Sequence, residues 1–299
     1  MSADPPSPAR QRDAPTFSPG PTDAVGECAA LVRRHDRDRY LAALTAPRES
    51  RAALVALYAF NLEIARVRET ASEPILGRIR LQWWRETLDT ICDGGPVRQH
   101  AVALALAEAI RRCGLDRAAL GRMIEGREFD LEDRQPATLD ELVAYADATS
   151  GTLAVLAMTT LGVHGEGAQL AARESGIAWA LAGLLRAVPF HAAQRRVYLP
   201  RADIDDDAAL RELFAGRSGE KLAQAVAAVA ARARGHLATA RGHRLAVPRV
   251  GLAALLPAAL IESDLSELER VRFDAFAARG ATPIARQARL MWAALRGHY

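Results

Sequence analysis

The segment 184–200, LLRAVPFHAAQRRVYLP, joins a long apolar run to basic side chains, a combination that could line a ligand-binding cavity. Arg186 and His191 lie five residues apart, with Pro189 between them. A guanidinium beside a titratable imidazole could bind a buried anion or the carboxylate of another protein. Alternatively, Arg186 pairs with a core acid such as Asp130 and holds helices together. The segment contains no carboxylate, so it offers nothing to ligate a hard cation such as Mg²⁺.

The segment 56–69, ALYAFNLEIARVRE, places a second group of polar side chains within an apolar helix pattern. Asn61 and Glu63 lie about one helical turn before Arg66, so they could form the polar lining of a pocket. Alternatively, Asn61 bonds to a neighbouring helix while Glu63 and Arg66 lie on a surface turn. Glu69 follows Arg66 by three residues, a spacing that favours an ion pair on a helix surface.

A pair of tryptophans follows in a third segment, where Arg80 and Trp83 could line a cavity and hold an anionic group. The helix pattern of residues 76–92 places Ile79 and Trp83 on the core face. Because neighbouring side chains point about 100° apart on a helix, at most one of Trp83 and Trp84 faces the same core as Ile79. At least one of the two is therefore expected to be ordinary core packing.

An acidic run at 125–133, EGREFDLED, is the remaining place for a metal site. Glu125, Glu128 and Glu132 are spaced three and four residues apart, so on a helix they would share one face. Such a stripe is more typical of a solvated surface. Facing a cavity, it could ligate Mg²⁺.

Helices are expected to position these residues, because apolar residues recur with helical spacing along almost the whole chain. Amphipathic stripes cover 49–70, 76–92 and 219–245, whereas alternating strand patterns are nearly absent. Residues 1–24 hold six of the fifteen prolines and few large apolar side chains. Such a composition cannot offset the entropy lost on ordering. The sequence predicts a disordered proline-rich tail at 1–24 and one all-α domain at 25–299.

The bulk composition disfavours several classes of protein. The 39 basic and 36 acidic side chains leave a net charge of only +3, with no basic stripe interleaved with aromatic residues, so no nucleic-acid partner is expected. The three cysteines lack CxxC spacing, which favours a reducing compartment over a disulfide framework or a zinc site. No run reaches the roughly 18 continuous apolar residues of a membrane span.

Two of these segments, read together, resemble the squalene/phytoene synthase family of head-to-head prenyl transferases. Residues 56–69 are similar to that family's YAFCRxxDDxxD, and residues 180–200, ALAGLLRAVPFHAAQRRVYLP, are similar to QLxNILRDxxEDxxRGRVYLP without a gap. The resemblance implies a single-domain isoprenoid-synthase-type helical bundle with a central cavity. In that family, facing aspartate-rich helices hold Mg²⁺ ions, which bind the diphosphate of an isoprenoid substrate.

The acids that hold the metal in that family are mostly absent here. Five of the six acidic positions carry other residue types, and the six aligned positions are Ala65, Arg66, Glu69, Ala187, Phe190 and His191. Without facing carboxylates a cavity cannot anchor Mg²⁺, so we expect no catalytic residues, no metal and no cofactor. The side chains expected to line the cavity and contact a ligand are Asn61, Arg80, Trp83, Tyr145, Arg186 and His191.

The chain also resembles a non-enzymatic branch of the family, the mitochondrial assembly factors of respiratory complex I (NADH:ubiquinone oxidoreductase). The similarity lies in AFNLEIARVRE, in LRAVPFH followed by RRVYLP, and in VRFDAF. It implies a catalytically degenerate protein whose partners are complex I subunits or assembly intermediates, with an isoprenoid or quinone-like ligand as a further candidate. An apolar patch beside 252–263 would dock onto a subunit or a membrane surface.

The Ala- and Arg-rich composition suggests a bacterial member of this branch, cytoplasmic and peripheral to the inner membrane, whereas the eukaryotic relatives would act on the matrix side of mitochondria. The alternative function is an active head-to-head prenyl transferase with unusual metal ligation. Such an enzyme would need Mg²⁺ and isoprenoid diphosphates.

Overall fold

The computed structural model describes residues 21–71, 73–132, 134–204 and 206–299. Most of the tail predicted at 1–24 lies outside these residues. Helix α1 (Pro21–His35) begins at residue 21, within the last residues of the predicted tail. Proline is favoured in the first turn of a helix, and Asp23 adds an acid where the helix dipole favours one.

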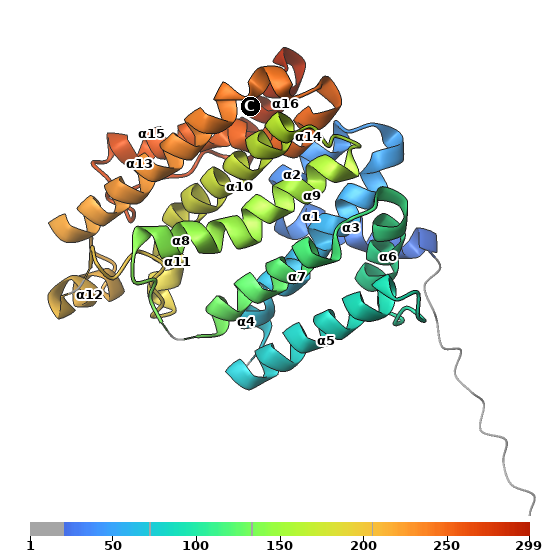
Figure 1. Ribbon diagram of the computed structural model, residues 1–299. Coiled ribbons are helices and arrows are strands. Elements are labelled where there is room, and N and C mark those ends of the chain that lie inside the picture. Colours follow the sequence, from blue (N-terminus) through green and yellow to red (C-terminus); the bar gives the residue numbers. More distant parts are fainter. Residues whose placement is uncertain (1–20, 72, 133, 205) are drawn as a thin grey trace, which may run out of the picture.

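The architecture is entirely helical, and the described residues contain no strand (Figure 1). This confirms the predicted all-α fold class. The longest helices are α3 (Arg48–Ala65), α5 (Pro74–Cys92), α10 (Glu166–Arg186) and α13 (Glu220–Gly242). The other α-helices are α2 (Arg37–Leu44), α4 (Val67–Thr70), α6 (Ala101–Cys113), α7 (Arg117–Gly126), α8 (Leu139–Ala146), α9 (Thr152–Thr160), α11 (Val188–Ala193), α12 (Asp207–Phe214), α14 (Leu252–Leu255), α15 (Ile261–Arg270) and α16 (Pro283–Arg296).

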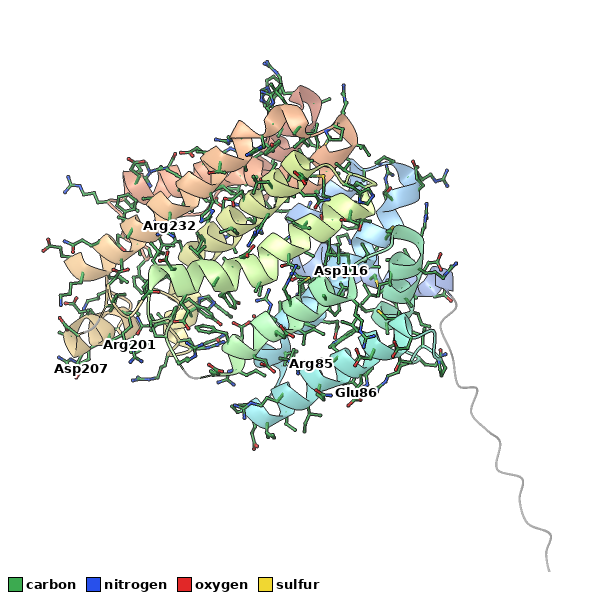
Figure 2. All side chains as sticks on the ribbon, in the orientation of Figure 1. Arg85, Glu86, Asp116, Arg201, Asp207 and Arg232 are labelled. Carbon is green, nitrogen blue, oxygen red and sulfur yellow. The ribbon has the colours of Figure 1, made fainter. Side chains whose placement is uncertain are left out.

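Among the described residues there are also five short helical turns. Four are 3₁₀ turns and one, η2, is a π-helical turn; they are η1 (Arg127–Leu131), η2 (Asp147–Gly151), η3 (Arg244–Ala246), η4 (Arg249–Gly251) and η5 (Leu256–Leu260). Side chains fill the space between the helices, while charged groups such as Glu86, Arg201 and Asp207 are exposed at the surface (Figure 2).

Helix α10 lies at the centre of the bundle and contacts α9, α13 and η2. Gly176 permits the closest approach, since a Cβ at this position would lie 2.3 Å from the backbone oxygen of Ser150. The π-helical turn η2 is therefore held against α10, and it joins α8 to α9 in one helical run, Leu139–Thr160. By length and composition this run could cross a membrane, but 56% of its apolar window is buried in the bundle, as expected of a core helix.

Helix α5 turns a different face to the core from the one predicted. Leu81 and Trp84 are buried, whereas Ile79 is 59% exposed. The side chain of Leu131 packs directly over Gly77, where a Cβ would lie 2.5 Å from Leu131 Cδ2. This contact fixes the rotation of α5 and leaves Trp83 at the edge of the core.

The stretch 252–263, beside which an apolar docking patch is predicted, is itself largely core. Leu255, Leu256, Leu260 and Ile261 are all buried. They lie in α14, η5 and the start of α15. Both α14 and η5 pack against α2, and η5 also packs against α16. Burial on several sides explains why the stretch reads as a continuous apolar run.

Candidate functional site: a cationic cavity

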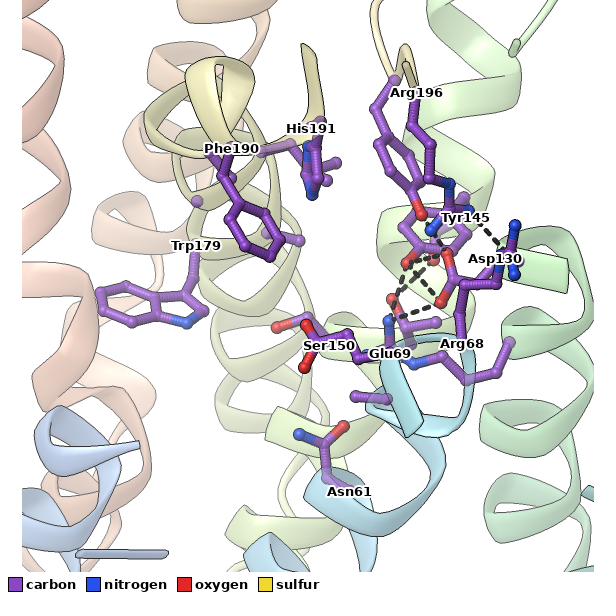
Figure 3. Close-up of a pocket in the computed structure, with 18 of the residues that line it drawn as sticks. Asn61, Arg68, Glu69, Asp130, Tyr145, Ser150, Trp179, Phe190, His191 and Arg196 are labelled. Carbon is purple, nitrogen blue, oxygen red and sulfur yellow. Dashed lines mark hydrogen bonds and ion pairs between the residues drawn. The ribbon is translucent and has the colours of Figure 1, made fainter. Parts of the chain in front are cut away.

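A cavity of about 280 Å³ opens between the C-terminal end of α3, α4, η1, η2, α10 and α11. Figure 3 places Trp179, Phe190 and His191 on one side of it and Asp130, Tyr145 and Arg196 on the other. The resemblance predicted a cavity in this region, and both of the sequence segments that carry the resemblance contribute to its lining.

Asp130 is the centre of a buried hydrogen-bonded cluster on one wall. The side chain is nearly inaccessible, and its carboxylate accepts hydrogen bonds from the Tyr145 hydroxyl (2.9 Å) and the Tyr198 hydroxyl (2.7 Å). Arg127 Nη1 lies 3.2 Å from the same carboxylate and also donates to the Tyr145 oxygen at 2.7 Å. The Asp130 backbone oxygen accepts from Arg196 Nη2. The Asp130 oxygens are thus occupied by protein donors.

Burial keeps the two phenols of this cluster in the protonated, donating form. It raises the pKa of Tyr145 and of Tyr198 well above that of a free tyrosine, and the Asp130 carboxylate raises both further. Burial also costs the Arg127 guanidinium its hydration, and Asp130 and Tyr145 compensate for this loss, so that the pKa of Arg127 is raised overall. The cluster is one unit in which each buried polar group depends on the others.

The charges that line the cavity are predominantly positive. Four arginines contribute to the lining, against the two carboxylates of Glu69 and Asp130. Arg39 pairs with Asp36 (2.7 Å), outside the lining, and donates to the Ser150 hydroxyl (3.0 Å). The remaining arginines of the lining are Arg68, Arg127 and Arg196.

His191 is a partly buried imidazole on the α11 side, with its ring centroid 4.6 Å from that of Tyr198. Burial and, to a lesser extent, the nearby Arg196 lower the pKa of His191 to about 4, against a smaller opposing effect of Asp130. The side chain is therefore neutral at physiological pH. Protonating it would add a cation to a wall that already has an excess of positive charge.

Five of the six positions aligned with the family's metal-binding acids line the cavity: Ala65, Glu69, Ala187, Phe190 and His191. The sixth, Arg66, does not. Its guanidinium forms the predicted i,i+3 ion pair with Glu69 at 3.4 Å, at the break between α3 and α4. The wall that would face a metal is thus largely apolar on α10 and α11.

Three of the six predicted cavity residues are found in the lining: Asn61, Tyr145 and His191. Asn61 is nearly inaccessible, and its Oδ1 atom has no hydrogen-bond partner among the described residues. An unsatisfied buried amide oxygen costs free energy unless a ligand or water donates to it.

The other three predicted cavity residues lie elsewhere. Arg80 is on the outer surface, where it lies 3.6 Å from Glu63. Trp83 packs edge-on against Trp84 and His100. Arg186, the last residue of α10, does not contribute to the lining, and it bonds to Asp264 at 2.8 Å rather than to Asp130. The rotation of α5 places Arg80 at the surface and Trp83 at the edge of the core, whereas Arg186 is held by Asp264.

The acidic run at 125–133 does not form a shared face. Helix α7 ends at Gly126 and the chain continues as the 3₁₀ turn η1, so the helical register of Glu125 is lost before Glu128. Glu128 is exposed and pairs with Arg85 at 2.6 Å, while Glu132 pairs with Arg134. No group of three or more His, Cys, Asp or Glu side chains suited to a metal ion occurs among the residues described. The residues present therefore do not fit the Mg²⁺ ions of the family.

Sequence reasoning missed most of the cationic wall: Arg39, Arg68, Arg127 and Arg196, and the aromatic Trp179 opposite. A local signal existed for one pair, since Arg127 and Asp130 have i,i+3 spacing. For Arg39 and Trp179 there was none, because they come from distant helices and meet only in the fold (guanidinium to ring centroid, 5.7 Å).

Comparison with known proteins gives a consistent family match. The family described as squalene/phytoene synthase matches residues 32–294. Complex I assembly factor 6 of Rattus norvegicus is 34% identical over 269 residues, which are 89% of this chain and 80% of the relative. The squalene synthase HpnC of Alicyclobacillus acidocaldarius superposes with a TM-score of 0.74 at 22% identity, over 84% of this chain and 94% of the other. A dehydrosqualene synthase gives a TM-score of 0.78 at 17% identity, over 93% and 97% of the two chains.

We predict that Asp130→Asn lowers the free energy of unfolding by about 3 kcal/mol, because it leaves the buried Arg127 charge without its counter-ion. Glu128→Gln, two residues away, removes an exposed ion pair and should cost no more than about 1 kcal/mol. Denaturant titration of the two variants measures the difference. Equal effects would show that the Asp130 cluster is not a stability determinant.

The lowered pKa of His191 predicts a pH dependence of stability. The unfolded side chain takes up its proton near pH 6.5 and the folded one only near pH 4. The free energy of unfolding is therefore unaffected by this group above pH 6.5, and it decreases as the pH falls from 6.5 toward 4. Since the ring is partly exposed, we expect a loss of about 1–2 kcal/mol. His191→Asn should remove this component from the pH profile of unfolding, and an unchanged profile would contradict the assignment.

Proposed function

Because the chain belongs to the squalene/phytoene synthase family, we propose that it is a catalytically degenerate member that acts in the assembly of respiratory complex I (NADH:quinone oxidoreductase). The observation that carries the proposal is the composition of the cavity wall. Positions where the family has metal-binding acids hold Ala65, Ala187, Phe190 and His191, and the buried Asp130 is occupied by Tyr145, Tyr198 and Arg127.

The loss matters because of the chemistry that Mg²⁺ performs in such enzymes. A divalent ion neutralises the charge that grows on the diphosphate as the C–O bond breaks. Arginines can bind a diphosphate, but binding substrate and transition state equally does not accelerate ionisation. A wall of guanidiniums beside a neutral imidazole supports binding rather than prenyl transfer.

The assembly role is supported by relatives that are named complex I assembly factor 6 and are 34% identical over most of this chain. Its partners would be complex I subunits or assembly intermediates. For a bacterial chain, the place of action would be the cytoplasmic surface of the inner membrane, where such intermediates are built.

The cavity would hold a ligand with a polar head and an apolar body, such as an isoprenoid or a quinone. The cationic wall and the unsatisfied Asn61 amide suit the head, while Trp179, Leu184 and Phe190 offer apolar surface to the body. No metal is needed for such binding.

The assembly role predicts that deletion of the gene from the source cell lowers the amount of assembled NADH:quinone oxidoreductase on native gels, with rescue by a plasmid copy. Normal levels after deletion would contradict it.

The degenerate site makes a separate prediction. Purified protein with Mg²⁺ and farnesyl or geranylgeranyl diphosphate should yield no squalene- or phytoene-type product above a heat-killed control. Product formation would refute the loss of catalysis.

Ligand binding is tested by filling the cavity. Gly183 lines it, and a Cβ at Gly183 meets nothing within 4 Å, so Gly183→Trp can project into the open space without disturbing the backbone. Native mass spectrometry should detect a co-purifying lipid in the wild-type chain and not in this variant. Gly121→Trp, at an equally open position on α7, is the matched control and should retain the lipid. No adduct in the wild type, or equal adducts in both variants, would contradict the proposal.

A further inference from the structure

Helix α16 exposes large apolar side chains on the face that points away from the bundle. The exposed fractions are 82% for Ile284, 48% for Met291, 60% for Trp292 and 73% for Leu295. Their spacing of seven, one and three residues brings them onto one side of the helix. These four side chains are called the outer face of α16. Figure 1 shows helix α16 at the upper edge of the bundle.

The outer face is not part of the buried core. On the opposite side of the same helix, Leu290 and Ala293 are buried in a cluster with Ala42, Leu256 and Leu260. An ordinary surface helix has one apolar side and one polar side. Helix α16 has two apolar sides, and one of them has no partner among the described residues.

A basic pocket of about 340 Å³ borders the outer face at Trp292, and Arg241, Arg289 and Arg296 contribute to its lining. Arg241 donates to the backbone oxygen of Tyr299, and Arg289 donates to the Ser263 hydroxyl. The Arg296 guanidinium lies 4.4 Å from the Trp292 ring centroid. In the part of the chain that the structure describes, no side-chain carboxylate pairs with any of the three.

The sequence around these arginines is poor in acids. Neither residues 221–261 nor residues 275–299 contain a single Asp or Glu. The two acids beside Ser263 are already paired, Glu262 with Arg234 and Asp264 with Arg186 and Arg286. A second copy of the chain is a poor occupant, because a two-fold contact through this face would bring identical arginines together. An apolar helix face bordered by unneutralised arginines matches an anionic bilayer, in which apolar groups enter the headgroup boundary and guanidiniums bind lipid phosphates.

We propose that the outer face of α16, with its adjoining basic pocket, docks this protein onto an anionic phospholipid bilayer. Trp292 and Leu295 lie within the headgroup–acyl boundary, and Arg289 and Arg296 bind phosphates at its rim, with their aliphatic stems along the apolar surface. This inference does not depend on the proposed assembly role.

The test is flotation of the full chain with vesicles of phosphatidylcholine alone and of phosphatidylcholine mixed with phosphatidylglycerol. We expect binding to the anionic vesicles, weakened by added salt. The double variant Trp292→Ala/Leu295→Ala should bind anionic vesicles at least about tenfold more weakly, because it removes most of the apolar area that inserts. Arg289→Gln/Arg296→Gln should reduce binding to anionic vesicles toward the level seen with phosphatidylcholine alone.

The matched control is Ile75→Ala/Ile79→Ala, which removes two apolar side chains of similar exposure from α5. It should leave vesicle binding unchanged, and thermal unfolding should confirm that all variants are folded. Failure of the wild-type chain to float with anionic vesicles would overturn the proposal, as would equal losses in the α5 and α16 variants. The proposal would also be overturned if the α16 variants bound vesicles normally but no longer bound a complex I subunit. The outer face would then be a protein-docking site.

Discussion

The buried carboxylate of Asp130 is the constraint on which the cavity depends. A charge removed from water must be compensated by donors of good geometry, and here two tyrosine hydroxyls and the Arg127 guanidinium provide them. These donors come from η1, α8 and the segment after α11, so the charge also fixes the relative positions of three parts of the chain. The same compensation occupies the carboxylate oxygens, and a carboxylate surrounded by donors is a poor ligand for a cation.

The cavity wall and helix α16 are connected through a second set of charges. Asp264 pairs with Arg186 of α10 (2.8 Å) and with Arg286 of α16 (2.9 Å). Both guanidiniums lie about 6 Å or less from the ring centroid of Trp179, which lines the cavity. A buried acid thus links the proposed bilayer-docking helix to the wall of the proposed ligand site. Ligand binding and docking would therefore act on neighbouring parts of one network.

Only part of the candidate site could be anticipated from the sequence. Asn61, Tyr145 and His191 were expected in the cavity and are found there, and the Arg66–Glu69 pair forms as its spacing predicts. Arg80 and Trp83 lie on α5, whose rotation follows from the packing of Leu131 over Gly77, and Arg186 is engaged by Asp264. The acidic run failed for a different reason, since its helix ends within it.

The sequence by itself determined that the chain is helical, because apolar spacing of three and four residues suits no other structure. It also determined that five of the six positions aligned with the metal-binding acids carry other residue types. Only the tertiary structure decided which side chains replace them. Periodicity orders residues around their own helix but says nothing of how that helix is rotated against its neighbours. The four arginines of the cavity and the unpartnered face of α16 follow from that rotation.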